Sequence, residues 1–497
     1  MSARNRRVLL LIDSATRDGP SQLLTAFYLK RRGVQVVVCN QRTLGYMYER
    51  YRPEVVFASW FVGEMEGNFL RRICRRSRIV LVDQEGGRMG EEAFKRAMAD
   101  QHDARFRLSR IATRVIAWGP AQAQWLKDLR CIAPDRIIIT GCPRTDPYLV
   151  PPVTPAQDQR FLGVTLRADR ITSNPRTIID AIFESLFVDP RQGLTPNLPL
   201  QAQYEDWIWQ AVAVTRHMLK IAWEVSQRAQ VPIVLRPGPW EQHGVYHGVA
   251  RHIPQLSVEP MQLQHEYTRQ AFATVDASSA LGLEAILAGT PVISVNALVP
   301  GLGAHVGGPG GTRFNAPYRP FYWHPSTVEE AVGLILQAQR GVLPVVPTRQ
   351  GLDAYFQDYL HWPSDRPASF AIGDLLVELL DVPLGTPVDP EVDGEPPPAG
   401  ASWRRLFYRL PGSAHAQQAR LWWHLLVRSP DRELYQRYHY FPWSYPHHVK
   451  LERLFEVLWQ RYVVGAPANQ IGTPAGTVAA TADAAGEAVG SLIEAPR

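Results

Sequence analysis

The chain has 497 residues, too many for one hydrophobic core, so we expect two domains and a further segment. With 45% hydrophobic and 20% charged residues it has the composition of a folded globular protein, and no apolar run reaches the roughly 18 residues of a membrane-spanning helix. A formal net charge of +6 favours anionic partners, such as phosphorylated substrates and acidic lipid surfaces, and no nucleic-acid-binding module is recognisable.

The beginning of the chain predicts a cytoplasmic protein. The apolar run at residues 8–12 stops at Asp13, which is too early for the core of a signal peptide. The cysteines lack Cys-x-x-Cys spacing and therefore predict reduced thiols rather than a disulfide framework or a zinc site. They are Cys39, Cys74, Cys131 and Cys142.

The first 150 residues alternate between apolar runs and helical segments, which is the pattern of a doubly wound parallel sheet. Strands are predicted at 7–12, 34–39, 53–60, 78–82 and 114–119, with helices at 23–32 and around 101–112. Such sheets bind ligands at the carboxyl ends of their strands. We therefore expect the loops after Ile12, Ser59 and Val82 to face a ligand cleft.

The loop after Val82 carries two carboxylates, Asp83 and Glu85, followed by two glycines. At the end of a buried strand, a carboxylate in this position could take a proton from a bound hydroxyl group. The alternative is a polar turn in which the glycines supply backbone freedom. The Asp-x-Glu spacing lacks the surroundings of a metal-binding motif, so no metal is predicted.

The sequence from Gly141 to Asp146, Gly-Cys-Pro-Arg-Thr-Asp, closes the first predicted domain, residues 1–150. We expect Arg144 to meet a phosphate and Asp146 to order the turn. The proline-rich residues 150–155 form a stiff bridge to the second predicted domain, residues 156–380.

The second predicted domain begins with a strand at 161–166. An amphipathic helix is predicted at 177–187, a long helix at 206–229 and a strand at 231–235. Arg236 stands at the carboxyl end of that last strand, and its planar guanidinium matches the geometry of phosphate oxygens. A proline-rich turn with an exposed arginine is the alternative.

The stretch 273–295 predicts a strand, a polar turn, a helix and a second strand. Ser278 and Ser279 are typical N-cap residues, and an N-terminus of this kind offers free N–H groups and a positive dipole end that suit a phosphate. Glu284 lies six residues after Ser278, about 9 Å along a helix, where its carboxylate could hold the ribose of a nucleotide. An ordinary βαβ unit is the alternative.

The residues from Ser278 to Ala285, together with Gly289-Thr-Pro-Val-Ile, resemble the donor-binding segment of GT-B-fold glycosyltransferases. The similarity is closest to proteins of bacterial capsule and lipopolysaccharide biosynthesis, and nucleotide-sugar epimerases of the same architecture share the segment. The resemblance implies an α/β GT-B fold, in which two Rossmann-like domains face each other across a deep cleft and the second binds a nucleotide sugar. It implies a donor site, with no metal and no cofactor, that includes Arg144, Arg167, Arg236, Ser278, Ser279 and Glu284.

Two further motifs match in part. Bacterial sialyltransferases carry an acidic-acidic-Gly motif whose acidic residue acts as general base, and Glu85-Gly86 is similar to its end, whereas Gln84 replaces the first acidic residue. We therefore favour Glu85 over Asp83 as the base. Transferases that use CMP-linked donors carry a His-Pro motif where this chain has Gly238-Pro239, which weakens the expectation of a CMP-linked donor.

The C-terminal part of the chain changes in composition. Helices are predicted at 327–338, 352–360 and 369–380, and in GT-B proteins the last helix crosses back to the first domain. Residues 383–400 are a predicted linker, and residues 465–497 a disordered tail. Residues 401–464 read as an aromatic, basic helical appendage that packs on the core, lies on a membrane or contacts a partner.

Together these features predict a metal-independent glycosyltransferase. It would transfer a sugar from a nucleotide-sugar donor to a bacterial surface polysaccharide or lipopolysaccharide acceptor, including a lipid-linked glycan. Peripheral contact with the inner membrane is one option for its location. Two alternatives remain: a nucleotide-sugar epimerase on the same scaffold, and a non-catalytic glycan-assembly protein with a degenerate GT-B fold.

Overall fold

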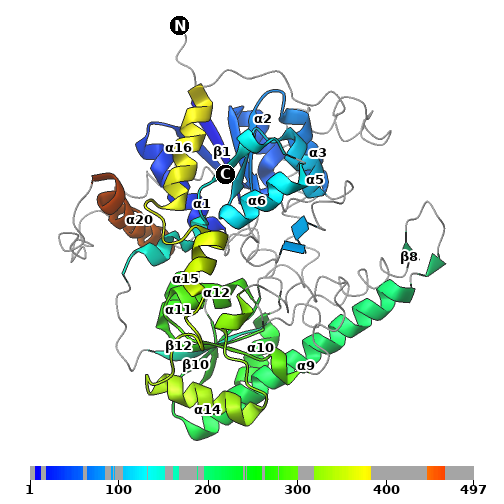
Figure 1. The fold of residues 1–497 in the computed structure, drawn as a ribbon, viewed down its shortest axis with the longest axis vertical. Coiled ribbons are helices and arrows are strands. Elements are labelled where there is room, and N and C mark those ends of the chain that lie inside the picture. Colours follow the sequence, from blue (N-terminus) through cyan, green and yellow to red (C-terminus); the bar gives the residue numbers. More distant parts are fainter. Residues whose placement is uncertain are drawn as a thin grey trace.

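Two α/β units follow each other along the longest axis of the molecule, with helices around both sheets (Figure 1). This computed structural model describes residues 6–12, 18–59, 64–83, 91–92, 94–95, 104–130, 132–151, 160–166, 187–188, 195–196, 198–238, 241, 243–259, 263–277, 279–299, 318–381 and 445–464. The predicted linker at 383–400 and the predicted tail at 465–497 lie outside these residues.

The first domain is built on a six-stranded sheet of order β2-β1-β3-β4-β5-β6 in which all neighbours are parallel. Its central strands are runs of Val, Leu, Ile and Phe that are buried on both faces, as in sheets covered by helices on both sides. The strands are β1 (Arg7–Ile12), β2 (Gln35–Asn40), β3 (Val55–Ser59), β4 (Arg78–Val82), β5 (Arg114–Ala117) and β6 (Ile137–Ile139). The helices are α1 (Gly19–Arg31), α2 (Leu44–Tyr51), α3 (Glu64–Ile73), α5 (Ala104–Ile111) and α6 (Pro120–Leu129).

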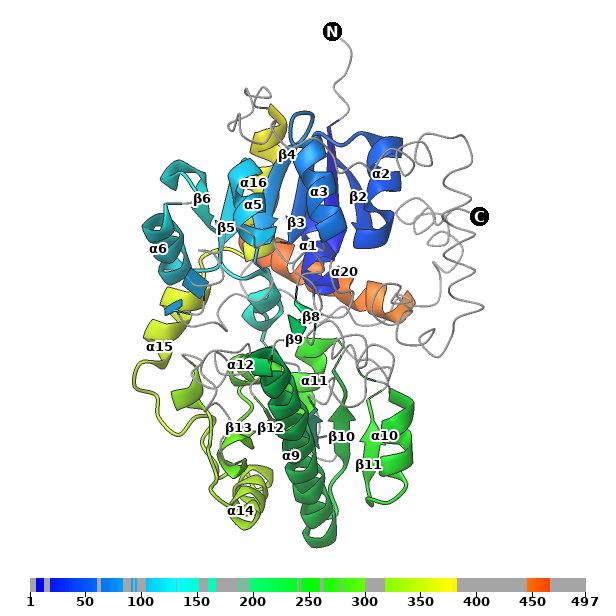
Figure 2. The ribbon, with the colours of Figure 1, turned by 90° about the vertical axis from the view of Figure 1, so that its right-hand side faces the viewer.

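The second domain has a five-stranded parallel sheet of order β11-β10-β7-β12-β13 (Figure 2). Its strands are β7 (Phe161–Thr165), β10 (Ile233–Arg236), β11 (Leu256–Val258), β12 (Ala271–Asp276) and β13 (Val292–Ser294). Its helices are α9 (Leu198–Arg228), α10 (His243–Ala250), α11 (Gln264–Gln270), α12 (Ala280–Leu287) and α14 (Val328–Gln339). Both sheets confirm the doubly wound α/β fold that the alternating apolar runs predict.

The sequence patterns miss three features of the second domain. Residues 177–186 of a predicted helix lie outside the described residues, and Phe187, its last residue, belongs instead to the strand β8 (Phe187–Val188). This strand pairs antiparallel with β9 (Thr195–Pro196). The helix α10 and the strand β11 have no counterpart in the predictions; the three residues of β11 are too few to show a period.

The chain returns to the first domain through α15 (Leu352–Tyr355), the π-helix η7 (Phe356–Leu360) and α16 (Ala368–Asp381). Helix α16 packs on α1, where the rings of Tyr28 and Phe370 stack with centroids 4.7 Å apart. A side chain at Gly373 would collide with the ring of Tyr28, so glycine is required for this close approach. The predicted helix that crosses back to the first domain is confirmed.

The two domains share one hydrophobic cluster. It contains Val8 and Leu10 from the first sheet, Leu283 and Ile286 from α12, and Leu376 from α16. Since burial of apolar surface is worth about 25 cal/mol per Å², this common core stabilises the contact between the domains.

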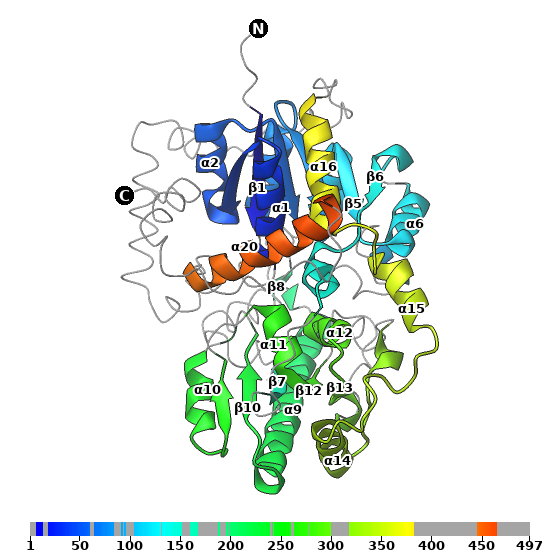
Figure 3. The ribbon, with the colours of Figure 1, turned by 90° about the vertical axis from the view of Figure 1, so that its left-hand side faces the viewer.

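The helix α20 (Tyr445–Trp459) crosses the first domain beside α1 and α16 (Figure 3). Leu451 and Phe455 are buried against Phe27 and Phe370, and Lys450 forms an ion pair of 2.9 Å with Glu266 of α11. Of the three options predicted for residues 401–464, packing on the core is the one that residues 445–464 adopt; residues 401–444 lie outside the described chain. None of the helices in the described chain is long and apolar enough to cross a membrane.

Candidate functional site

A row of polar residues runs along the carboxyl edge of the second sheet. Arg236 ends β10 and is in register with Thr165 at the end of β7, which is in register with Asp276 at the end of β12. Asp276 is in turn in register with Ser294 at the end of β13, and Glu259 directly follows β11. Because neighbouring strands are about 4.8 Å apart, these side chains form a continuous polar edge, the position at which parallel sheets bind ligands.

At one end of this edge Arg236 forms an ion pair with Glu259. Its Nη1 donates to Oε1 of Glu259 at 2.7 Å, and the side chains are only 12% and 4% exposed. The guanidinium also lies 5.1 Å from the ring centroid of Tyr267, a cation–π distance. The charge of the predicted phosphate ligand Arg236 is therefore already balanced by a carboxylate of the same domain.

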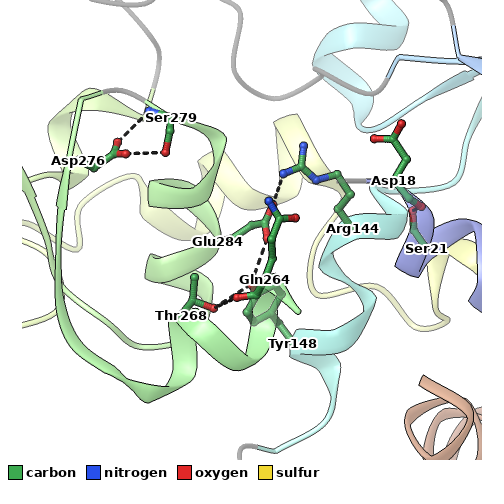
Figure 4. A network of polar contacts seen from close by, with 9 residues as sticks. All are labelled: Asp18, Ser21, Arg144, Tyr148, Gln264, Thr268, Asp276, Ser279 and Glu284. Carbon is green, nitrogen blue, oxygen red and sulfur yellow. Dashed lines mark hydrogen bonds and ion pairs between the residues drawn. The ribbon is translucent and has the colours of Figure 1, made fainter. Parts of the chain in front are cut away.

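The N-terminus of α12 faces a carboxylate. The backbone N–H of Ser279 donates to Oδ2 of the fully buried Asp276 at 2.8 Å, and the Ser279 hydroxyl donates to Oδ1 (Figure 4). An anion at a helix N-terminus is stabilised by the free N–H groups and the dipole. Asp276 thus already supplies a negative charge at the position predicted for a phosphate. Ser278 lies outside the described residues.

Glu284 of α12 points across the domain boundary to Arg144, with which it forms a buried ion pair (Figure 4). The two side chains are 7% and 5% exposed. The hydroxyl of Tyr148 donates to Oε2 of Glu284 at 3.2 Å and lies 3.0 Å from the hydroxyl of Thr268 on α11. Arg144 and Tyr148 belong to the 3₁₀ segment η3 (Pro143–Leu149), so a first-domain segment contacts α11 and α12.

The surroundings of Glu284 keep the phenol of Tyr148 protonated and leave a small pocket. Burial, reinforced by the charge of Glu284, raises the pKa of Tyr148 well above its ordinary value, so the phenol remains a donor. The pocket beside the ion pair has a volume of about 20 Å³, enough for one water molecule. Its lining comes from both domains and includes Trp118, Thr145, Leu283 and Tyr318.

On the first sheet, Asp83 directly follows β4 and is 1% exposed. Gln122 of α6 donates its amide N–H to Oδ2 of Asp83 at 3.0 Å and accepts the backbone N–H of Trp118 at 2.8 Å. These two hydrogen bonds hold the side-chain amide of Gln122 in one orientation, and Gln122 in turn holds the carboxylate of Asp83. Glu85, the favoured base, lies outside the described residues.

Asp146 orders a more distant element than the sequence predicts. Its carboxylate accepts the backbone N–H groups of Ala368 at 2.7 Å and Ser369 at 2.8 Å, which are the first residues of α16. Burial raises the pKa of Asp146 to about 7. Asp146 is therefore the cap of the helix that crosses back to the first domain.

The structure brings Arg144 and Glu284 together, although they are 140 residues apart in the chain. Arg236 and Ser279 lie along the polar edge, and Asp83 belongs to the first domain; Ser278, Glu85 and Arg167 are outside the described residues. Asp276, Glu259 and Tyr148 are site residues that the sequence does not predict. Asp276 and Glu259 follow or end short strands, a position that the rule on carboxyl ends could have identified, whereas no local pattern marks Tyr148.

Within the described chain, no group of three or more His, Cys, Asp or Glu residues is placed to hold a metal ion. Cys39 and Cys142 are free, buried thiols whose pKa is raised by desolvation, and Cys74 is half-buried and also free. They are inert positions rather than nucleophiles.

No family model and no curated protein sequence matches the chain. Solved structures do match its fold. UDP-GlcNAc 2-epimerase from Methanocaldococcus jannaschii is 11% identical, with a TM-score of 0.42, and the match covers 75% of this chain and 99% of the epimerase.

Two other solved structures are similar at the same level. The wall teichoic acid polymerase TagF is 10% identical, with a TM-score of 0.46, over 76% of this chain and 90% of TagF. The glycotransferase of kitacinnamycin is 12% identical, with a TM-score of 0.37, over 76% of this chain and all of that chain, 100%. At these identities the likeness is one of fold alone.

Proposed function

We propose that this chain is a metal-independent glycosyltransferase that takes a sugar from a nucleotide donor and passes it to a bacterial surface polysaccharide or lipopolysaccharide. The observation that carries the proposal is the meeting of Arg144 and Glu284 beside the polar edge of the second sheet. In this ion pair a cation, which can bind a phosphate, is in direct contact with a carboxylate, which can bind a ribose. The resemblance of the segment around Ser279 to donor-binding segments supports the same assignment.

Glu284 and Arg144 divide the donor between them in this proposal. The carboxylate of Glu284 accepts hydrogen bonds from the ribose hydroxyls, and the guanidinium of Arg144 turns to the adjacent phosphate. Without a donor the two neutralise each other, because either charge alone would be costly at exposures of 5% and 7%. Ribose and phosphate are neighbours in a nucleotide, so one ligand satisfies both groups.

Asp276 changes the role predicted for the start of α12. With a carboxylate already bonded to Ser279, a phosphate at this N-terminus meets a like charge, which Arg144 and Arg236 must offset. We place the phosphate between these arginines and the first turn of α12, with Ser278 and Arg167 as further donor-binding residues. Arg236 then shares its charge between Glu259 and the donor.

In the transfer step, Glu85 takes the proton of the acceptor hydroxyl. The acceptor oxygen forms a bond to the anomeric carbon of the sugar, and the bond from that carbon to the phosphate oxygen breaks, with its electron pair leaving on the phosphate. The two arginines stabilise the developing charge without a metal. Asp83 is buried and held by Gln122, which suits a residue that positions the loop more than one that must reach a substrate.

The proposal is tested by incubating the full-length chain with a panel of nucleotide sugars, with and without glycan acceptors, and measuring nucleotide release and the sugar product. A transferase releases nucleotide in proportion to glycosylated acceptor. Conversion of the donor sugar without an acceptor would replace the proposal by an epimerase, and binding of donors with no turnover by a non-catalytic assembly protein.

The base is tested separately. Glu85→Gln should lower turnover by about 10²–10⁴-fold, the usual contribution of a positioned base, with donor affinity nearly unchanged. Glu91→Gln is the matched control, because Glu91 lies exposed after the same loop and pairs with Lys95. Full activity of Glu85→Gln together with loss of activity in Asp83→Asn would transfer the role of base to Asp83.

A further inference from the structure

Helix α9 has two apolar faces. One face packs on the second sheet through Val214, Met218, Ile221 and Val225. On the opposite side Trp209 is 71% exposed, Val212 38% and Trp223 44%. Figure 2 shows α9 on the face of the second domain that is turned to the viewer, in front of the sheet.

These three residues, the exposed Arg216 and the partly buried Leu219, which also packs against the core of the second domain, lie on a single stripe. Trp209, Val212, Arg216, Leu219 and Trp223 are spaced alternately by three and four residues, which aligns them along one side of a helix over about 20 Å. Large tryptophan rings left in water are unfavourable, and a contiguous exposed apolar surface marks a contact site. We call these five residues, with the adjacent Lys220, the α9 stripe.

The charges on the α9 stripe are positive. Arg216 and Lys220 are exposed on this face. Among the described side chains of α9 the one carboxylate is that of Glu224, and Arg228 engages it at 3.1 Å. The stripe therefore combines aromatic rings with basic side chains, the composition of helices that lie in the interface of an anionic membrane.

A second copy of the chain fits the stripe poorly. In a parallel pair of α9 helices each residue faces its own copy, and in an antiparallel pair centred on the stripe Trp209 faces Trp223 while Arg216 again faces Arg216. Either arrangement puts two like charges at the centre of an apolar seam, which is destabilising. An anionic lipid surface instead attracts Arg216 and Lys220 and accepts the tryptophan rings between its headgroups.

We propose that the α9 stripe is a peripheral docking surface for an anionic phospholipid bilayer. The helix lies on the membrane and does not cross it, in keeping with the finding that α9 is not apolar enough to span one. Docking through the second domain leaves α20 in its place, packed against α1 and α16. The surface is separate from the proposed donor site, so the inference holds whether or not the chain is a transferase.

The test is co-sedimentation of the full chain with vesicles of phosphatidylcholine alone and of phosphatidylcholine mixed with phosphatidylglycerol, without any nucleotide. Binding is expected to the mixed vesicles only. Arg216→Gln with Lys220→Gln should lower the partition coefficient about thirtyfold, because each basic side chain near an anionic surface contributes about fivefold. Trp209→Ala with Trp223→Ala should lower it at least about tenfold.

Two controls keep the test decisive. Val342→Ala changes an apolar residue that is 66% exposed away from α9 and should leave binding unchanged. Trp209→Phe with Trp223→Phe should retain most of the binding. If the tryptophan-to-alanine variant fails to fold, the Arg216→Gln/Lys220→Gln variant, which changes only exposed side chains, is the deciding test. Equal binding of wild type and the Arg216→Gln/Lys220→Gln variant, or a stripe variant that turns a dimer into a monomer without affecting vesicle binding, overturns the proposal.

Discussion

Two buried Arg–Glu pairs lie near the polar edge of the second sheet, and they differ in what they join. Arg236 and Glu259 come from neighbouring strands of one domain, 23 residues apart in the chain. Arg144 and Glu284 come from different domains and are 140 residues apart. The first pair is fixed by the sheet, whereas the second persists only while the domains stay together.

The difference follows from the cost of burying charge. Desolvating two ions costs several kcal/mol each, and the attraction between them offsets this cost only while both partners are in place. Within a sheet the partners cannot separate. Between domains, a movement or a ligand that supplies new partners can separate them, so the Arg144–Glu284 pair is suited to respond to a donor and the Arg236–Glu259 pair is suited to hold shape.

The largest expected effect comes from breaking the interdomain pair. Glu284→Ala leaves the guanidinium of Arg144 buried without its carboxylate and should lower the free energy of unfolding by about 3–5 kcal/mol. Replacing both residues together, Arg144→Met with Glu284→Leu, removes both charges and should restore most of the loss. Urea denaturation followed by circular dichroism measures the stability of the wild type and of both variants.

The exposed pair of Arg228 with Glu329 is the control for this experiment, since Glu329 is 71% exposed. Arg228→Ala should leave the free energy of unfolding close to the wild-type value, because an exposed ion pair contributes little. A double variant as unstable as Glu284→Ala alone would mean that lost packing, not the removal of the carboxylate from Arg144, causes the loss.

Asp146 extends the comparison to a buried carboxylate that is held by backbone N–H groups instead of an arginine. Burial raises its pKa from the ordinary 3.8 to about 7, so between these values the native state keeps a proton that the unfolded chain releases. Stability from this group is therefore highest at low pH and is lost as pH rises toward 7. Asp146→Asn should remove this slope from a plot of Tm against pH. A slope that persists in the variant would assign it to other groups.

Much of this fold is predictable because its signals are local. The buried strands around Leu10 and Leu81 are continuous apolar runs, and Gly119-Pro120 and Gly289 mark a helix start and a helix end where the structure has them. These signals depend on a few neighbouring residues, so one sequence contains them.

For the candidate site, the sequence predicts individual residues but not the contacts between them. Arg144 and Glu284 were both expected to bind a donor, but their contact depends on how two domains pack, which no local pattern specifies. For the same reason Asp146 is expected from its sequence to order its own turn, whereas its partners are Ala368 and Ser369 in a distant helix. Asp276 is the exception, because it ends a strand and the rule on carboxyl ends could have identified it.

Replacing Arg144 should change the affinities for two ligands in opposite directions. Arg144→Met frees Glu284, so a nucleoside, which offers a ribose and no phosphate, should bind more tightly by up to about tenfold, or about 1.4 kcal/mol. The corresponding nucleoside diphosphate should bind more weakly, because Arg144 no longer meets its phosphate. Isothermal titration with the two ligands measures both changes. Loss of affinity for both ligands alike would show that Arg144 only holds the structure together.

The smallest expected effect comes from replacing the planar guanidinium of Arg236 in the second domain. Arg236→Lys keeps a positive charge beside Glu259 but removes the planar guanidinium that lies 5.1 Å from the ring of Tyr267. Loss of this cation–π contact should cost about 0.5–1 kcal/mol of stability. Thermal unfolding of Arg236→Lys and Arg236→Met distinguishes the shape of the cation from its charge, because the second variant removes the positive charge beside the buried Glu259 and should lose clearly more stability. Equal losses in the two variants would mean that Glu259 is held by its other surroundings, and the contrast between a structural pair and a responsive pair would no longer rest on charge.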